Sequence, residues 1–173
     1  MDQAEEVGPL VWRRAAAADL DAIVAIQDQV HTMLPEQRAT FANKLMLFGE
    51  GCLVLGRDDV VLGYGISYPW RLGDVPPLDT PMTALPERAD CLFVHDVAIL
   101  PAGRGAGAGR RYIGHVSTLA RRDRLPSLAL VSVYDSRPIW TACGFKMTSA
   151  PDMAKKLAVY GSTACYMTAS LDL

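Results

Sequence analysis

A glycine-rich stretch that also carries arginines is the part of the sequence whose residue types most clearly suggest binding chemistry. The letters "LPAGRGAGAGRRYI", from Leu100 to Ile113, place four glycines between an apolar run and a helical pattern. A helix N-terminus leaves backbone N–H groups unpaired and carries partial positive charge, which suits a pyrophosphate. Glycines let the backbone approach phosphate oxygens without a Cβ clash, and Arg104 adds a permanent positive charge. The stretch therefore predicts a loop that binds a diphosphate.

Two nucleotide-binding motifs fit this stretch less well. A nucleotide P-loop needs a lysine directly after its last glycine, and none is present. Gly103, Gly105 and Ala108 do satisfy the dinucleotide fingerprint G-x-G-x-x-[G/A]. However, the acidic residue expected about 20 residues later would fall near Asp123, in a loop rather than at a strand end. A nicotinamide-dependent oxidoreductase is therefore kept only as an alternative.

The spacing Arg104-x-x-Gly107-x-Gly109, between a strand and a helix, is similar to the R/Q-x-x-G-x-G/A signature of the GNAT superfamily of acyl-CoA-dependent N-acyltransferases. "LFVHDVAILPAGRGAGAGRRYI" resembles the fourth strand and cofactor loop of that family. "SVYDSRPIWTACGF" resembles a later segment in which a short helix ends in a G-F pair. The resemblance covers about Val11 to Leu171 and implies acetyl-CoA as the acyl donor. Its diphosphate would be held by the cofactor loop, which consists of Arg104, Gly105, Ala106, Gly107, Ala108, Gly109 and Arg110.

The resemblance also implies the fold and the place of the thioester. We expect an α/β (α+β) domain with a mixed, mostly antiparallel central sheet, flanked by helices and splayed between the fourth and fifth strands. The pantetheine arm would lie in the splay and bond the backbone of Val97, Ala98 and Ile99. A backbone N–H near the splay would then stabilise the oxyanion.

Transfer of an acetyl group to an amine requires a base and an acid. Arylalkylamine acetyltransferases in this family carry histidines on the fourth strand, which makes His95 the candidate base; a hydrogen-bonded strand histidine is an equal alternative. Asp96 ranks second as a base, or orients a neighbour. Regular alternation along the strand predicts one face with Phe93, His95, Val97 and Ile99 and an opposite face with Val94, Asp96 and Ala98.

The candidate acid departs from the family pattern. Many members place a tyrosine where this chain has Trp140, which cannot usefully donate a proton and is expected to pack against the pantetheine or seal the site. Tyr134, at the end of the fifth strand, is the nearest phenol in the sequence and our candidate acid. Phe93 likewise stands where other members carry a carboxylate or histidine. A non-catalytic module that binds or senses acyl-CoA on the same fold is therefore a second alternative.

The hydrophobic pattern predicts the elements that must position these residues. We expect strands at 10–14, 91–99, 127–134 and 161–171 and a hairpin over 52–70 that turns at 57–59. Helices are expected over 20–30, with Asp19 as N-cap, over 34–51, from 107 to 122, and briefly before Gly144. The proline-rich segment 71–90 and the segment 31–35 should be loops that border the amine site.

Composition limits the class of protein. The chain has 173 residues, half of them apolar, and a net charge of −2, which gives no reason to expect nucleic acid as a partner. We expect a tail over residues 1–10 and a single N-acetyltransferase domain over 11–173. The four cysteines lack metal-site spacing, which predicts reduced thiols and no metal. The acidic start "MDQAEEVGPL" predicts no signal peptide, and the lack of a long apolar run predicts no membrane span, so we expect a cytoplasmic location. The expected partner is a primary amine of a small molecule or peptide, and the resemblance is compatible with a homodimer.

Overall fold

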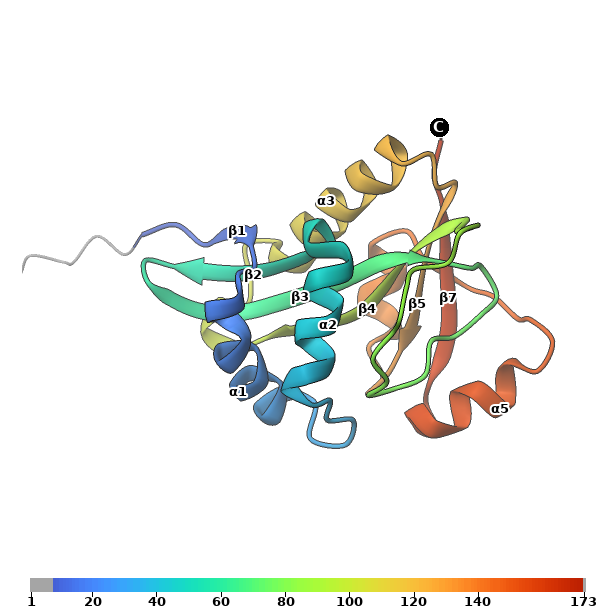
Figure 1. The fold of residues 1–173 in the computed structure, drawn as a ribbon, viewed down its shortest axis with the longest axis horizontal. Helices are drawn as coiled ribbons and strands as arrows, with labels where there is room; N and C mark the ends of the chain where they lie inside the picture. The colour runs from blue at the N-terminus through green and yellow to red at the C-terminus, as the bar shows by residue number, and fades with distance from the viewer. Residues whose placement is uncertain (1–7, 173) are drawn as a thin grey trace, which may run out of the picture.

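The computed structural model describes residues 8–172, so most of the predicted N-terminal tail lies outside the described residues. A seven-stranded sheet with the order β1-β2-β3-β4-β5-β7-β6 runs through the molecule (Figure 1). The β4–β5 pair is parallel and the other pairs are antiparallel, which confirms the predicted mixed sheet. The strands are β1 Val11–Arg14, β2 Cys52–Arg57, β3 Val60–Trp70, β4 Cys91–Ile99, β5 Ser127–Ser132, β6 Lys146–Met147 and β7 Cys165–Ser170.

Helices cover both faces of this sheet (Figure 1). One face carries α1, α2 and α5, whose apolar side chains belong to one cluster. The other face carries α3 and α4, whose apolar side chains belong to a second cluster. No helix within residues 8–172 combines the length and the apolar character needed to cross a membrane. The helices are α1 Leu20–Val30, α2 Arg38–Phe48, α3 Ala108–Arg122, α4 Arg137–Ala142 and α5 Met153–Leu157.

The predicted helices form, with two local differences. Asp19 precedes α1, but its carboxylate does not cap that helix; it accepts the Ala16 N–H at 2.8 Å and pairs with Arg13 at 2.7 Å. The second helix begins at Arg38 rather than near residue 34, because the backbone is still extended at Gln37. The short elements β6 and α5 were not predicted.

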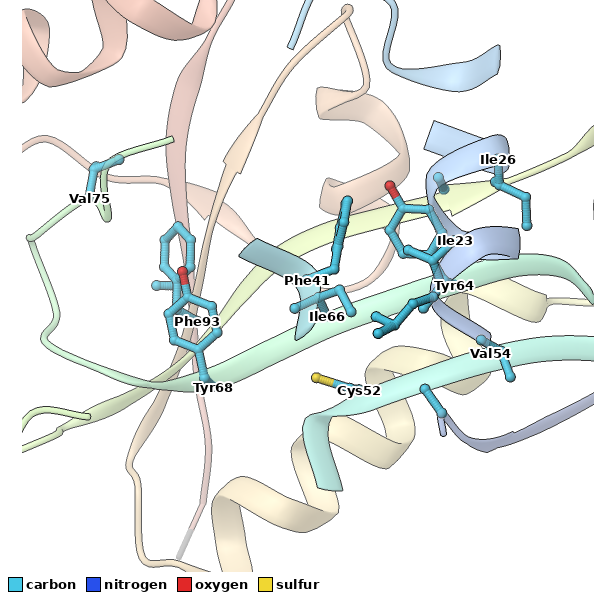
Figure 2. Close-up of a cluster of buried hydrophobic side chains, with 14 of the residues drawn as sticks. Ile23, Ile26, Phe41, Cys52, Val54, Tyr64, Ile66, Tyr68, Val75 and Phe93 are labelled. Atoms are coloured by element: carbon cyan, nitrogen blue, oxygen red, sulfur yellow. The ribbon is translucent and has the colours of Figure 1, made fainter. Parts of the chain in front are cut away.

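The core between the sheet and α1 and α2 is aromatic. Figure 2 shows Phe41 of α2 close to Tyr64 of β3, and their ring centroids lie 5.7 Å apart at an interplanar angle of 76°. Tyr68 and Phe93 continue this cluster along β3 and β4. On the other face, α3 buries the apolar stripe that its sequence predicts, which consists of Tyr112, Ile113, Val116, Leu119 and Ala120.

A β-bulge in β4 changes which side chains share a face. Ile66 of β3 pairs with Asp96, but the next residue, Ser67, pairs with Val94, so His95 is an extra residue in its strand. The extra residue shifts the alternation by one position. Val97 therefore packs with Val94 on the α3 side, whereas Asp96 and Ala98 join Phe93 and His95 on the α1 side. The predicted division of β4 into two faces was wrong from Asp96 onward, because it assumed an unbroken period of two.

Candidate active site

The strands β4 and β5 separate after a short paired stretch. Their pairing runs from Cys91 opposite Ser127 to Val94 opposite Leu130. Beyond that point a cleft of about 840 Å³ opens between them. Val97 and Ile99 of β4 line one wall, and the residues that follow β5, together with α4, line the other. The predicted splay between the fourth and fifth strands is confirmed.

The cofactor loop forms one end of this cleft. Gly105, Ala106 and Gly107 have positive φ values of 87°, 49° and 68°, so the chain is left-handed immediately before α3 begins at Ala108. A Cβ atom added at Gly105 or Gly107 would meet no atom within 4 Å, so both positions face open space. Within residues 8–172 the N–H groups of these three residues find no backbone acceptor. Free N–H groups at a helix N-terminus form a site that suits an anion.

Two arginines border this end of the cleft. Arg104 Nε donates to the Ile99 carbonyl at 3.0 Å, and Arg110 Nη2 donates to the Ala142 carbonyl of α4 at 3.2 Å. Both side chains are exposed and line the cleft. Arg111 instead turns away and donates to the Leu10 carbonyl at 3.1 Å. Positive charge therefore flanks the loop on two sides.

The predicted base, His95, lies in a closed cluster formed by Glu36, Lys44, Tyr68 and His95. His95 is among the residues that line the cleft, but its side chain is only 2% exposed. His95 Nε2 lies 2.6 Å from Glu36 Oε1 and 2.9 Å from Lys44 Nζ, and Nδ1 lies 2.8 Å from Tyr68 Oη. Because both ring nitrogens have protein partners, the geometry matches the alternative of a hydrogen-bonded strand histidine.

Glu36 connects the closed cluster to the neighbouring loops. Its Oε2 lies 2.8 Å from Lys44 Nζ and accepts the Asp79 N–H at 2.9 Å, while Gln27 binds its backbone N–H at 2.6 Å. Burial alone would raise the pKa of Glu36, but the adjacent His95 and Lys44 outweigh it and lower that pKa. The cluster thus fastens the segment before α2 and the 71–90 loop to the bulge in β4.

A second histidine, His31, lies at the cleft with Asp96, which the buried Tyr64 contacts; we call these three residues the cleft triad. His31 directly follows α1, and its N–H donates to the Gln27 carbonyl at 2.7 Å. Its Nε2 forms a close ion-pair contact of 2.6 Å with Asp96 Oδ1, and Tyr64 Oη donates to Asp96 Oδ2 at 2.6 Å. Sequence reasoning placed His31 only at the border of the amine site and missed this pairing, because it put Asp96 on the opposite face of β4.

The ionisation of His31 is set by its neighbours. Burial would lower its pKa, but the Asp96 carboxylate and the Val97 carbonyl outweigh burial and raise the pKa above the ordinary value. The side chains of His31 and Asp96 are only 13% and 12% exposed, yet both residues line the cleft. The triad therefore places a titratable imidazole at the cleft wall.

Tyr134 and Trp140 also line the cleft. The Tyr134 ring stacks on His31 with a centroid distance of 5.6 Å and an interplanar angle of 17°. Burial raises the pKa of its hydroxyl, although the Met33 N–H opposes that change. Trp140 Nε1 donates to Ser136 Oγ at 3.1 Å, and its ring meets the edge of Phe145 at 6.1 Å. The phenol chosen as candidate acid thus lies beside the triad, and Trp140 forms part of the wall.

Comparison with known proteins places the chain in a family. The model of the acetyltransferase (GNAT) family matches residues 20–145. Because this match covers most of the sequence, the chain belongs to the GNAT family. No curated protein sequence matches the chain.

Solved structures show the same fold at low sequence identity. N-acetylglutamate synthase from Neisseria gonorrhoeae, complexed with coenzyme A and N-acetyl-glutamate, is 18% identical with a TM-score of 0.73; the match covers 96% of this chain and 36% of that one. The loading GNATL domain of CurA from Lyngbya majuscula is 13% identical, with a TM-score of 0.73 and coverage of 94% and 98%. The ribosomal-protein-S18-alanine N-acetyltransferase from Escherichia coli is 16% identical, with a TM-score of 0.65 and coverage of 95% and 96%. This chain therefore spans about a third of the gonococcal synthase.

Proposed function

We propose that this protein is an N-acetyltransferase that moves an acetyl group from acetyl-CoA to a primary amine of a small molecule or peptide. The observation that carries the proposal is the cleft between β4 and β5, which begins at the left-handed backbone of Gly105 to Gly107. Membership of the GNAT family supports an acyl-CoA donor. Two similar structures bear names of enzymes that acetylate an amino group, on glutamate and on an alanine of a ribosomal protein.

The chain's own groups suit each part of acetyl-CoA. The N–H groups of the cofactor loop, with Arg104 and Arg110 beside them, offer donors and positive charge to the diphosphate. Past Val94, β4 has β3 as its neighbour on one edge and no β5 partner on the other. The backbone of Val97, Ala98 and Ile99 is therefore suited to bond the pantetheine arm as an added strand. Trp140 offers an apolar wall on the α4 side of the cleft.

Transfer requires two proton movements. The amine nitrogen attacks the thioester carbon, so that a C–N bond forms and the C–S bond breaks. A base removes the extra proton from nitrogen, and the departing thiolate takes a proton. In our proposal Tyr134 is the phenol that can supply the proton to sulfur, since its ring lies in the cleft.

Thermal unfolding with and without acetyl-CoA tests the binding half of the proposal. A ligand that prefers the folded state raises the melting temperature, so acetyl-CoA should raise it, whereas NAD and ATP should not. Gly107→Val should abolish this rise, because the added side chain would stand where the phosphates approach.

Gly73→Val is the matched control for Gly107→Val. Gly73 has a φ of 78°, close to the 68° of Gly107, but lies in the loop after β3 and does not line the cleft. Both variants carry similar backbone strain, and only Gly107→Val should lose the response to acetyl-CoA. A Gly107→Val protein that still binds acetyl-CoA at wild-type affinity would refute the assigned cofactor loop.

A non-catalytic acyl-CoA-binding module is a second candidate function. It is favoured by the occupied ring nitrogens of His95 and by Trp140 at the position where the family pattern has a tyrosine. Release of free thiol from acetyl-CoA in the presence of a panel of primary amines separates the two functions. Tight binding without thiol release would support the module and refute the transferase.

A further inference from the structure

We propose that His31, held by Asp96, is the general base that removes the proton from the attacking amine. The inference rests on the proposed acetyl transfer and names the residue that performs one of its steps. His31 and His95 both line the cleft beside a carboxylate and a phenol, but His95 has protein partners on both ring nitrogens and a side chain that is 2% exposed, whereas the side chain of His31 is 13% exposed. The third histidine, His115, does not line the cleft.

The triad lies at the end of the cleft opposite the cofactor loop. Asp96 follows the last β4–β5 pair, Val94 with Leu130, by two residues, whereas the cofactor loop begins after β4 has ended at Ile99. The stretch from Asp96 to Ile99 spans roughly 10 Å of strand. A donor that is fixed by its diphosphate at the cofactor loop and extends along β4 therefore brings its thioester toward the bulge, where His31 is found.

The two ring nitrogens of His31 have different roles in this proposal. Asp96 meets Nε2, so the proton from the amine goes to Nδ1. Tyr64, which is fully buried, binds the second oxygen of Asp96 and so fixes the carboxylate. Tyr134 stacks on the imidazole and limits rotation of the ring. A histidine oriented by a carboxylate in this way is the usual arrangement of a catalytic base.

Charge around His31 favours the protonated product of this step. The titratable groups that face it are Asp96 from β4, Glu36 from the segment before α2, Tyr64 from β3 and Tyr134 after β5. His31 also follows the C-terminus of α1, where the helix dipole favours a cation. Asp96 itself is less suited as the base, since both of its oxygens already have partners.

The test compares His31→Gln with His115→Gln. His115 is an exposed histidine of α3 whose Nε2 lies 3.1 Å from the Glu50 carbonyl, and it does not line the cleft. Thiol release from acetyl-CoA is measured with a panel of primary amines, and the rate in the absence of the enzyme is subtracted. His31→Gln should lose about 10²-fold or more in turnover while it keeps the thermal response to acetyl-CoA. His115→Gln should match the wild type in both.

The pH profile separates a base from a packing residue. Wild-type turnover should rise with pH as His31 loses its proton, and His31→Gln should lack this rise. Asp96→Asn removes the carboxylate that raises the pKa of His31, so the rise should move to lower pH at a reduced rate. If His31→Gln fails to fold, Asp96→Asn, which keeps the shape of its side chain, carries the same test.

Three outcomes would count against the proposals in different ways. Unchanged turnover and an unchanged pH profile in His31→Gln would overturn the role of His31 alone. A wild-type protein that does not bind acetyl-CoA would refute the proposed function at its first step. Binding of acetyl-CoA without enzyme-dependent thiol release in the presence of any amine of the panel would refute both the transfer and its base.

Discussion

The closed cluster and the cleft triad contain similar types of residue but have different roles. Each contains a histidine, a carboxylate and a buried tyrosine, and their histidine side chains are 2% and 13% exposed. The closed cluster adds Lys44, and each of its charged groups has an oppositely charged or hydrogen-bonded partner. The triad has no lysine, and although His95 also lines the cleft, His31 is the more exposed of the two histidines. A histidine whose two nitrogens both have protein partners holds a structure together, whereas a more exposed histidine at a cleft can exchange protons.

The bulge in β4 brings the two sites side by side. His95 enters the closed cluster, and Asp96, the next residue, enters the triad. In a regular strand these neighbours would point to opposite faces of the sheet. The comparison therefore predicts that changes in the closed cluster alter mainly stability, whereas changes in the triad alter mainly turnover.

Removing the shared carboxylate of the closed cluster should have the largest effect. Glu36→Ala leaves Lys44 buried without its anionic partner, and breaking a buried ion pair in this way costs about 3–5 kcal/mol. Urea unfolding measures the loss. Glu50→Ala removes a surface partner of Arg122 and should cost far less, because exposed ion pairs contribute little to stability. Equal losses in the two variants would contradict the special role of the closed cluster.

Low pH should remove part of the stabilisation that the ionised Glu36 provides. The pKa of Glu36 in the folded protein lies below its ordinary value of 4.5, so its contribution is fully present above about pH 4.5. The contribution is lost as the pH falls from there through the folded-state pKa. The urea midpoint of the wild type should therefore drop more steeply below pH 4.5 than that of Glu36→Gln. Parallel curves for the two proteins would exclude this linkage.

His95→Gln should cost stability rather than catalysis. The change weakens buried contacts to Glu36 and Tyr68, for which we expect a loss of about 1–3 kcal/mol in the free energy of unfolding. Turnover per folded molecule, measured well below the melting temperature, should stay within a few-fold of the wild type. A 10²-fold loss of turnover with an altered pH profile would restore His95 as the base.

The smallest effect is expected from Tyr64→Phe, which removes the hydroxyl that holds Asp96. Turnover should fall by less than about tenfold, because Asp96 and His31 both remain. Tyr112→Phe is the matched control, since the buried Tyr112 hydroxyl donates to the Gly51 carbonyl at 2.9 Å on the other side of the sheet. Both variants should lose some stability, and only Tyr64→Phe should lose activity. Equal turnover in the two variants would argue that Tyr64 serves only to pack the core.

Local patterns were enough to predict most of the fold. Three features can each be recognised within one short segment of the sequence, and each forms as predicted: the apolar stripe of α3, the turn between β2 and β3, and the glycines before α3. The mixed sheet and its splay followed from the family resemblance. These features depend on neighbours in the sequence or on a motif that many related chains share.

The two histidine sites could not be predicted in this way. The closed cluster joins residues 36, 44, 68 and 95, whose separation in the sequence leaves no local pattern. Lys44 and Thr40 are buried on α2, so the polar pattern of that helix does not reveal its inner face. The bulge arises from pairing between β3 and β4, and a period of two applied to β4 alone misses it. That single error assigned Asp96 to the wrong face and concealed the partner of His31.

The bulge also has a consequence for how this chain can tolerate mutation. Deleting the codon for His95 would remove the extra residue and leave a regular strand, in which every later residue of β4 keeps its present partner on β3 and its present face. Val97 would stay on the α3 side and Ala98 on the α1 side. A deletion after the bulge, such as that of Val97, should by contrast turn Ala98 and Ile99 to the opposite face and be more harmful. A library of single-codon deletions, selected for folded protein, would measure that contrast along the whole chain.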